Sequence, residues 1–215
     1  MLKADLHVHT TYSVDCTTPL EEIIKRCLKI GINCLAIADH GTIAGALKLK
    51  EMAPFPVIVA EEILTPFGEI MGMFLNEEIP GKLSAEETIA RIRIQDGLVC
   101  IPHPYDRLRF SALEDKTLET IMPQVDIIEV FNARSLSPHA SDKARQLAHK
   151  YGKFASAGSD AHTVSELGHA YVEMPEFNGK DQFLASLTQG RICGHKSNPS
   201  VHLASTWAKL KKRSS

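Results

Sequence analysis

Short apolar runs alternate with longer amphipathic segments along the whole chain. Each run is four to six residues long, as expected of a buried strand, and the segments between the runs have the length of helices. Strands that alternate with helices are typical of a parallel sheet or barrel. The predicted strands are residues 4–8, 34–38, 56–60, 70–75, 98–101, 126–131 and 154–157.

Capping residues mark the ends of the predicted helices. Thr18 and Pro19 are expected to open the first helix, and Gly31 to end it. The other boundaries are predicted at a capping box of Ser84 with Glu87, at Gly97, at Ser137 with Pro138, and at Gly152. Neither an internal repeat nor a long linker interrupts the pattern, so we expect one domain over residues 1–200 and a basic C-terminal tail over residues 201–215.

The charge of the chain excludes a broadly basic surface for binding nucleic acid. The 215 residues include 24 Lys and Arg against 26 Asp and Glu, which gives a net charge of −2. The exception is the C-terminal end, where Lys209, Lys211, Lys212 and Arg213 lie beside Trp207, the only tryptophan. We interpret this cluster as a solvated terminal helix rather than as a contact for nucleic acid or a membrane.

The cysteines and the N-terminus favour a cytoplasmic protein. The five cysteines include no CxxC pair and form no dense framework, which indicates reduced thiols. The first residues lack the basic, apolar and small-residue zones of a signal peptide. Apolar stretches also stay short of the roughly 18 residues that a spanning helix needs, so we expect no membrane partner.

Ten histidines are the unusual feature of the composition, and several of them follow the predicted strands. His7 and His9 are two apart on the first strand, so their side chains point the same way and can share a metal ion. In a parallel barrel the carboxyl ends of all strands converge on one face, where active sites form. The imidazoles and carboxylates at these ends are therefore expected to form one cluster: His7, His9, Asp15, His40, Glu62, His103, Asp160 and His162.

Eight such groups are more than one divalent ion can use. A catalytic zinc ion takes about three protein ligands and a water, so the number of groups indicates two or three ions. Nitrogen and oxygen donors without thiolates suit Zn, Mn and Fe alike. The neighbouring Asp5 and Asp39 are expected to orient imidazoles through hydrogen bonds, and strand register favours Glu62 over Glu61 as a ligand.

Six segments that carry these residues follow one another in a distinctive order. They read DLHVHTTYSVD, IADHGT, EEILT, IPHP, EVFNARS and AGSDAHTVSELG, and they cover most of the chain from residue 3 to about 170. Together they resemble the polymerase and histidinol phosphatase (PHP) superfamily of metal-dependent phosphoesterases. The resemblance implies a single α/β domain, a distorted (β/α)7 TIM-like barrel, with two or three divalent metal ions at its mouth.

The resemblance also implies roles for the predicted ligands. It makes His7 and His9 ligands of one metal ion, and Asp15 and His40 ligands of a second. The last motif is filled by Asp160 and His162.

A third ion is implied by the middle of the chain. Glu62 takes the position of a bridging glutamate, and His103 matches a ligand of the third ion. Many family members place a histidine shortly after the glutamate, whereas residues 68–73 of this chain contain none. Either Glu69 substitutes for that histidine or only two ions bind.

Hydrolysis at such a centre needs no protein nucleophile. A water between two ions about 3.5–4 Å apart becomes hydroxide near neutral pH and attacks phosphorus, while the ions neutralise the phosphoryl oxygens. Planar cations stabilise the same charge, so Arg134 is the first candidate phosphate ligand, followed by Arg107 and Arg109. Either His162 or His169 would protonate the leaving oxygen. The predicted catalytic residues are Asp160, His162 and Arg134.

We expect the substrate to be a small phosphorylated metabolite, a nucleotide or a short oligonucleotide, with nucleic acid bound only as a short substrate. Two alternatives stay open. An amidohydrolase that cuts C–N bonds also begins with HxH on a barrel strand, although its later strands carry other ligands. A non-catalytic PHP-like scaffold or RNA-processing subunit would use the basic tail to contact RNA. The sequence says nothing about oligomeric state.

Overall fold

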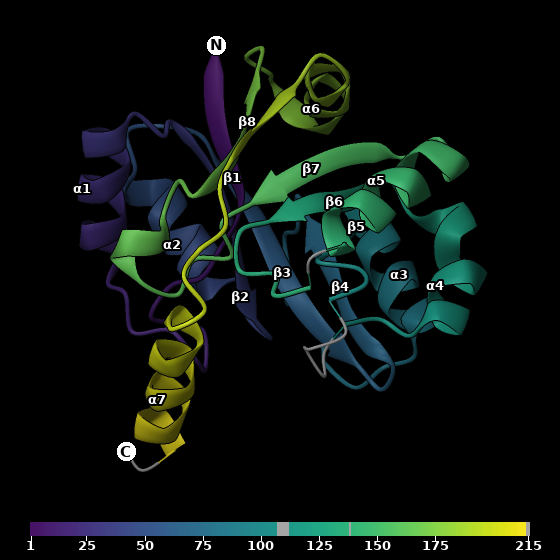
Figure 1. Cartoon of the computed structure of the whole chain (residues 1–215), viewed down its shortest axis with the longest axis horizontal. Helices are drawn as coiled ribbons and strands as arrows, with labels where there is room; N and C mark the ends of the chain where they lie inside the picture. The colour runs from purple at the N-terminus through teal and green to yellow at the C-terminus, as the bar shows by residue number, and fades with distance from the viewer. Residues whose placement is uncertain (107–111, 138, 214–215) are drawn as a thin grey trace.

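The computed structural model describes residues 1–106, 112–137 and 139–213. A nine-stranded sheet forms the centre of the molecule, and helices pack around it (Figure 1). The strands are β1 (Leu2–Val8), β2 (Cys34–His40), β3 (Val57–Thr65), β4 (Gly68–Met73), β5 (Leu98–Ile101), β6 (Ile127–Asn132), β7 (Phe154–Gly158), β8 (Ala170–Met174) and β9 (Arg191–Gly194). The helices are α1 (Leu20–Ile30), α2 (Ala44–Met52), α3 (Ala85–Ile94), α4 (Asp115–Ile121), α5 (Ala140–Tyr151), α6 (Gly179–Thr188) and α7 (Val201–Arg213), with short 3₁₀ turns at Met122–Gln124 and Val164–Glu166.

The sheet bends into a nearly closed barrel. Its strand order is β7-β6-β5-β4-β3-β2-β1-β8-β9, and a bridge between Val8 and Ala161 joins the end of β1 to the segment after β7. This bridge brings the first and last strands of the β1 to β7 series together, whereas β8 and β9 extend the sheet beyond β1. The predicted α/β barrel is therefore confirmed.

The strands are not all parallel, and β4 is the main departure from the predicted pattern. The strand predicted at residues 56–60 continues to Thr65, turns sharply and returns antiparallel as β4. The turn is tight because the Thr65 hydroxyl donates to the Gly68 carbonyl and accepts from the Phe67 amide, while Gly68 adopts a φ of 131°. Consequently the amino end of β4 lies at the end of the barrel where β2 and β3 finish.

Strands β8 and β9 lie outside the predicted set. β8 alternates between buried and half-buried positions, and β9 is half-buried or exposed throughout. Neither has the continuous apolar run that marks a fully buried strand. They pair with each other antiparallel and add to the open side of β1.

Two layers of buried apolar side chains lie on opposite faces of the sheet. The inner layer mixes alanines and cysteines with larger apolar residues, and α6 adds Phe183 and Leu187 near the amino end of β1 (Figure 1). Its strand residues include Leu2, Ala4, Leu6, Cys34, Ala36, Ala38, Ile58, Ala60, Met71 and Met73. Side chains such as Leu35, Ile37 and Leu49 fill the outer layer between strands and helices. Small inner side chains suit the narrow interior of a barrel with few strands.

Three of the predicted helix caps are confirmed, whereas α3 ends at Ile94 with Gln95 as its C-cap, before the predicted Gly97. Gly31 and Gly152 are left-handed, with φ of 76° and 60°, and end α1 and α5. Ser84 and Glu87 form the predicted capping box at the start of α3. At the start of α5 the structure differs, because the helix begins at residue 140, and the predicted Pro138 lies outside the described residues.

The start of α1 also differs from the prediction. The helix begins at Leu20, with Pro19 at the N-cap position and without a side-chain cap. Thr18 does not cap the helix, because its hydroxyl donates to the carbonyl oxygen of His162 at 3.1 Å. The residue predicted to cap the helix therefore joins its start to the segment after β7, 144 residues farther along the chain.

The basic C-terminal segment folds as α7, which projects from the body of the molecule (Figure 1). The ammonium group of Lys212 donates to the carbonyl oxygens of Thr11 and Ser13, so the helix contacts the loop that follows β1. Trp207 is 60% exposed, and the Lys211 ammonium lies 5.3 Å from the centre of its ring. Among the described residues, helices long and apolar enough to cross a membrane are absent.

Candidate metal centre

The strand ends bring the predicted ligands together at one end of the barrel. Every one of them belongs to a group whose candidate ligand atoms lie within 4.8 Å of one another. They come from β1 and the loop after it, from β2 and β3, and from the segments after β5 and β7: His7, His9, Asp15, His40, Glu62, His103, Asp160 and His162. The predicted cluster is therefore present, and the role of each residue as a ligand stays a prediction.

The first donor set is formed by His7, His9, Glu62 and Asp160. The Nε2 atoms of His7 and His9 are 3.2 Å apart. The Glu62 Oε2 atom lies 3.3 Å from the Nε2 of His7 and 3.4 Å from that of His9. The Asp160 Oδ1 atom lies 3.3 Å from the Nε2 of His9. Two imidazole nitrogens and two carboxylate oxygens thus converge on one buried point.

An irregularity in β1 turns these histidines into the barrel. Leu2, Ala4 and Leu6 belong to the inner apolar layer, so strict alternation would point odd-numbered residues outward. The pairing of β1 with β2 shifts register toward the carboxyl end of β1. A shift of this kind re-aims side chains, and it accounts for His7 and His9 facing the same interior as Leu6.

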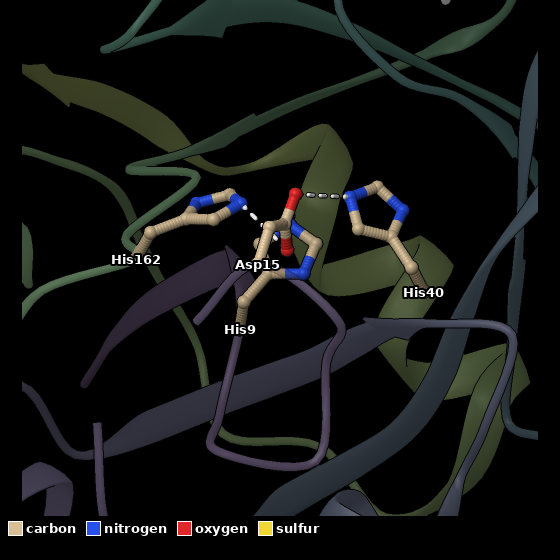
Figure 2. A group of neighbouring side chains, drawn as sticks. All are labelled: His9, Asp15, His40 and His162. Atoms are coloured by element: carbon tan, nitrogen blue, oxygen red, sulfur yellow. Dashed lines mark ion pairs between the residues drawn. The ribbon is translucent and has the colours of Figure 1, made fainter. Parts of the chain in front are cut away.

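The second donor set is formed by Asp15, His40 and His162. The Asp15 carboxylate lies between the two imidazoles, with one oxygen 3.3 Å from the Nε2 of His40 and the other 3.3 Å from the Nε2 of His162 (Figure 2). His9 lies beside them in the same view. The Nδ1 of His162 donates to the carbonyl of Asp160 at 2.8 Å, which leaves its Nε2 facing Asp15.

The third donor set is formed by Glu62, His103 and Glu69. The Nε2 of His103 lies 2.8 Å from Glu62 Oε1 and 3.6 Å from Glu69 Oε2. The other Glu62 oxygen belongs to the first set, so the two oxygens of one carboxylate face two different donor sets. Glu69 also places Oε1 3.6 Å from the Nδ1 of His40.

The electrostatics of the cluster balance buried charges against one another. Burial opposes charge on the Glu62 carboxyl, but His7 and His40 hold its pKa well below the usual range. Burial also opposes charge on His40, yet Glu62 and the carboxylates beside it raise its pKa to about 10. Burial and the nearby His162 lower the pKa of His9 to about 3, so His9 is neutral at physiological pH.

Divalent metal ions fit the residues present. In the first set, two imidazole nitrogens lie close to each other and to two carboxylate oxygens. All four side chains are almost fully buried. Buried carboxylates need paired charges or metal ions to offset their loss of water. Imidazole and carboxylate together are the donors that Zn, Mn and Fe accept. The three donor sets are therefore candidate positions for divalent ions.

Two residues that were not predicted, Glu129 and Asn132, form hydrogen bonds to residues of the cluster. Glu129 on β6 accepts from the Nδ1 of His7 at 3.1 Å and from the His103 amide at 2.7 Å. Asn132 donates to Glu129 at 3.0 Å and to Asp160 at 3.1 Å. A sequence signal for Glu129 exists, because an acidic residue inside an apolar strand needs a buried partner.

Asp5 and Asp39 do not orient imidazoles, so that prediction is wrong. Asp5 accepts from the backbone amides of Ser159 and Gly168, at 2.8 and 3.1 Å. Asp39 accepts from the amide and the hydroxyl of Thr10, at 2.6 and 2.7 Å. Both carboxylates instead hold the segments after β1 and β7 in place through these hydrogen bonds.

Arg134 lies at the edge of the cluster. Its side chain is only 2% exposed, and its guanidinium contacts Glu166 at 3.5 Å, the Asp160 carbonyl at 3.4 Å and the Ser205 hydroxyl of α7 at 2.9 Å. Its contact with a phosphate stays a prediction. The other two candidate phosphate ligands, Arg107 and Arg109, lie outside the described residues.

His169 lies outside the three donor sets. Its Nδ1 is 2.8 Å from the Ser197 hydroxyl, and its ring centre is 4.5 Å from that of His195. Burial and His195 lower its pKa. Its suggested role as a proton donor stays a prediction.

The backbone behind His7 is closely packed. A Cβ atom on Gly158, at the end of β7, would lie 2.3 Å from the Cβ of His7, a distance that real atoms do not reach. The Asp160 amide donates to the His7 carbonyl at 2.7 Å, which fixes the two segments together. Asp160 and His103 have φ of 54° and 29°, an uncommon conformation that recurs at functional sites.

Solved structures of a PHP-like protein and of an amidohydrolase share this fold. A two-domain protein from Bacteroides vulgatus, described as containing a predicted PHP-like metal-dependent phosphoesterase, matches with a TM-score of 0.72 and 14% identity over 96% of this chain and 69% of its own. An amidohydrolase from Chromobacterium violaceum, with bound sulfate and no metal, matches with a TM-score of 0.63 and 18% identity over 77% of this chain and 90% of its own. At these identities the likeness concerns the fold.

Sequence comparison identifies the family. Residues 5–57 match the PHP domain, and residues 138–192 match the PHP-associated family. The uncharacterized protein MJ0417 of Methanocaldococcus jannaschii is 38% identical over 183 residues, which cover 82% of this chain and 72% of that protein. The chain belongs to the PHP family.

Proposed function

We propose that the chain is a phosphoesterase that hydrolyses a small phosphorylated metabolite, a nucleotide or a short oligonucleotide. The arrangement of Glu62 carries the proposal. Its Oε2 lies 3.3 Å from His7 and its Oε1 lies 2.8 Å from His103, so one carboxylate joins two donor sets. A carboxylate between two donor sets suits a pair of divalent ions, and paired ions are characteristic of phosphoester hydrolysis.

The protein's own part in this reaction is to orient donors and to supply charge. Divalent ions, when bound, activate water and neutralise phosphoryl oxygens. Glu129 holds the Nδ1 proton of His7, which directs the other ring nitrogen toward the first set. The Asp160 carbonyl does the same for His162. Arg134, beside that carbonyl, adds a buried positive charge at the edge of the site where a phosphate would bind.

A screen of phosphate esters tests the proposal. The purified chain is loaded separately with Mn, Fe and Zn and offered phosphomonoesters, nucleotides and short oligonucleotides. We expect release of phosphate or of a nucleotide with at least one metal, and its loss in Asp160→Asn. Asp142→Asn, an exposed change on α5, is the matched control and should keep full activity. The proposal fails if no ester is hydrolysed with any metal.

The likeness to an amidohydrolase of known structure supports a second candidate, cleavage of C–N bonds. The same metal-loaded preparations are offered N-acyl amino acids and cyclic amides, with amine release as the readout. Amine release without phosphate release would replace the phosphoesterase proposal. A scaffold without activity is separated by metal analysis, because it should contain well under one ion per chain as purified.

A further inference from the structure

The C-terminal helix α7 packs one of its faces against the rest of the chain. Ser205, Ala208 and Lys212 follow one another at helical spacing, so they lie on the same face of the helix. Ala208 is buried, and the other two side chains are half-buried. Leu203 and Trp207, elsewhere on the helix, are exposed. We call the face that carries Ser205, Ala208 and Lys212 the inner face of α7.

The first turns of α7 hold Arg134 by both its backbone and its side chain. The Nε2 of His202 lies 3.1 Å from the Arg134 carbonyl oxygen. The Nη2 of Arg134 donates to the Ser205 hydroxyl at 2.9 Å and to the Val201 carbonyl at 3.4 Å. The Ser205 hydroxyl donates its own proton to the His202 carbonyl at 3.1 Å, so its oxygen is left to accept from the guanidinium. The helix therefore sets the direction of this hydrogen bond.

The other nitrogens of the guanidinium lie beside the first donor set. The Nη1 of Arg134 lies 3.4 Å from the carbonyl oxygen of Asp160, whose carboxylate belongs to that set. The Nε lies 3.5 Å from a carboxylate oxygen of Glu166, which is fully buried. Contacts within the described residues engage both protons of Nη2 and one of Nη1. The second Nη1 proton is therefore available to an anion.

The end of the inner face contacts the loop after β1. The Lys212 ammonium donates to the carbonyl oxygens of Thr11 and Ser13. The Ser13 hydroxyl in turn donates to the Asp15 carboxylate at 2.8 Å. A single helix thus joins the loop that carries Asp15 to the segment that carries Arg134.

We propose that α7 is part of the phosphate-binding side of the site, and that Ser205 is a positioning residue that fixes the guanidinium of Arg134 for the phosphate of the substrate. A guanidinium held at Nη2 keeps its planar donors in one orientation, so less freedom is lost when an anion binds. The inference rests on the proposed function, which assigns Arg134 to the phosphate. Helix α7 lies outside residues 5–57 and 138–192, the two regions that match the family.

A simpler role for the contact would be to attach α7 to the body of the molecule. The two roles differ in what they change, because attachment affects only stability, whereas positioning affects the affinity of the folded protein for phosphate. Ser205→Ala removes the acceptor of Nη2. Ser205→Thr keeps a hydroxyl at the same place and is the conservative variant that should rescue binding.

Binding of inorganic phosphate is the main readout. Each variant is loaded with Zn, dialysed free of excess metal and titrated with phosphate in a calorimeter. We expect Ser205→Ala to bind phosphate about 3- to 10-fold more weakly, which is what the ordering of one long side chain costs. Ser205→Thr should bind phosphate as the unchanged chain does. The KM and kcat for any ester found in the screen are measured with the same variants.

A double-variant cycle with Arg134→Lys tests whether Ser205 acts through the arginine. Lysine keeps a positive charge beside Glu166 but ends in a single nitrogen in place of the fork that reaches Ser205. We expect Ser205→Ala to weaken phosphate binding no further in the Arg134→Lys background, because the effects of residues that act through one contact do not add.

Thr206→Ala is the matched control. Thr206 is the next residue on α7, it is exposed, and its hydroxyl also donates to the His202 carbonyl, at 2.9 Å. The substitution removes the same kind of hydrogen bond within the helix and leaves the contact with Arg134 in place, so phosphate affinity should not change. Thermal melting of every variant confirms that the fold is intact.

The inference is overturned if Ser205→Ala binds phosphate as tightly as the unchanged chain, if it weakens binding equally in the Arg134→Lys background, or if the unchanged chain binds no phosphate. These outcomes are distinct from failure of the proposed function. A chain that hydrolyses no phosphate ester and still loses phosphate affinity in Ser205→Ala would refute the phosphoesterase and retain the positioning role. A phosphoesterase whose phosphate affinity is indifferent to Ser205 would do the reverse.

Discussion

The amino and carboxyl ends of the barrel strands carry different kinds of side chain on the same inner face. On β2, Ala36 lies in the inner apolar layer and His40 lies in the metal centre. On β3, Ala60 and Glu62 are related in the same way. The amino ends are packed with apolar side chains that stabilise the fold, while the carboxyl ends gather charged groups that folding alone would not select. The comparison teaches that substitutions at the two ends should have separable consequences.

The largest difference between the effect on hydrolysis and the effect on stability is expected at the first donor set. His9→Asn should lower hydrolysis about 100- to 1,000-fold, because it removes a predicted ligand of an ion that would stabilise charge in the transition state. The unfolding free energy of the metal-free chain should change little by comparison. His9 is neutral, with a pKa lowered to about 3 by burial and His162, so its loss strands no buried counter-charge.

Steady-state kinetics and urea unfolding of the metal-free protein check this expectation. His149→Asn, an exposed change on α5, serves as the control for both measurements. A His9→Asn variant that keeps full activity would place the chemistry elsewhere.

The opposite end of the barrel should give the opposite result. Ala36→Leu inserts extra methylene groups into a filled inner layer and should lower the free energy of unfolding by about 1–3 kcal/mol. Metal content of the folded protein should be unchanged. Ala185→Leu on the exposed side of α6 controls for the substitution itself and should shift stability by less than about 0.5 kcal/mol. Loss of metal in Ala36→Leu would show that the two ends are coupled.

Glu129 lies between the two regions and should behave as a support for the centre. Glu129→Gln leaves the Nδ1 proton of His7 without its carboxylate acceptor, so metal affinity should fall about 10- to 100-fold. Metal titration followed by calorimetry measures the change. Glu173→Gln, a carboxylate on β8 outside the donor sets, should leave affinity unaltered. Equal metal affinities in Glu129→Gln and Glu173→Gln would show that Glu129 does not support the centre.

The last prediction concerns pH, and its effect is the smallest when it is expressed per pH unit. Burial disfavours charge on His40, but Glu62 and Asp15 outweigh it and raise the pKa from 6.5 to about 10. The metal-free chain therefore keeps this proton between those values, and a metal ion must displace it. Affinity should rise about tenfold per pH unit across this range for one displaced proton.

The same shift sets the sign of the stability change. A folded-state pKa above the unfolded value contributes stability below pH 6.5 that is lost as pH rises toward about 10. Stability of the metal-free chain should thus fall where metal affinity rises. Metal titrations and unfolding at several pH values within the range check both trends, and affinity that does not depend on pH would contradict them.

The sequence predicts the barrel well where each strand is a continuous apolar run. Strand β5 has the predicted bounds, and β1, β2 and β6 differ from theirs by a few residues at the ends. The direction of β4 is not readable, because it depends on a turn at Thr65 and Gly68 that joins two runs otherwise suited to parallel strands. β8 and β9 escape detection because their side chains are only partly buried.

The candidate centre could be anticipated because most of its residues follow strands, where a parallel barrel gathers them. Glu69 escapes this strand-end reasoning, since it lies near the amino end of an antiparallel strand, and only the family resemblance points to it. The surroundings of Arg134 are equally hidden. Its guanidinium is held by Ser205, 71 residues farther along the chain, and sequence patterns give no register between a loop and a distant helix.

Gly158 has a consequence for how the chain tolerates change. It carries no functional group, yet any larger residue there would collide with the backbone and Cβ of His7. In a saturation library selected for hydrolysis, position 158 should accept glycine alone and rank with the histidines in sensitivity. A residue without any functional group would then be as intolerant of substitution as the histidines beside it.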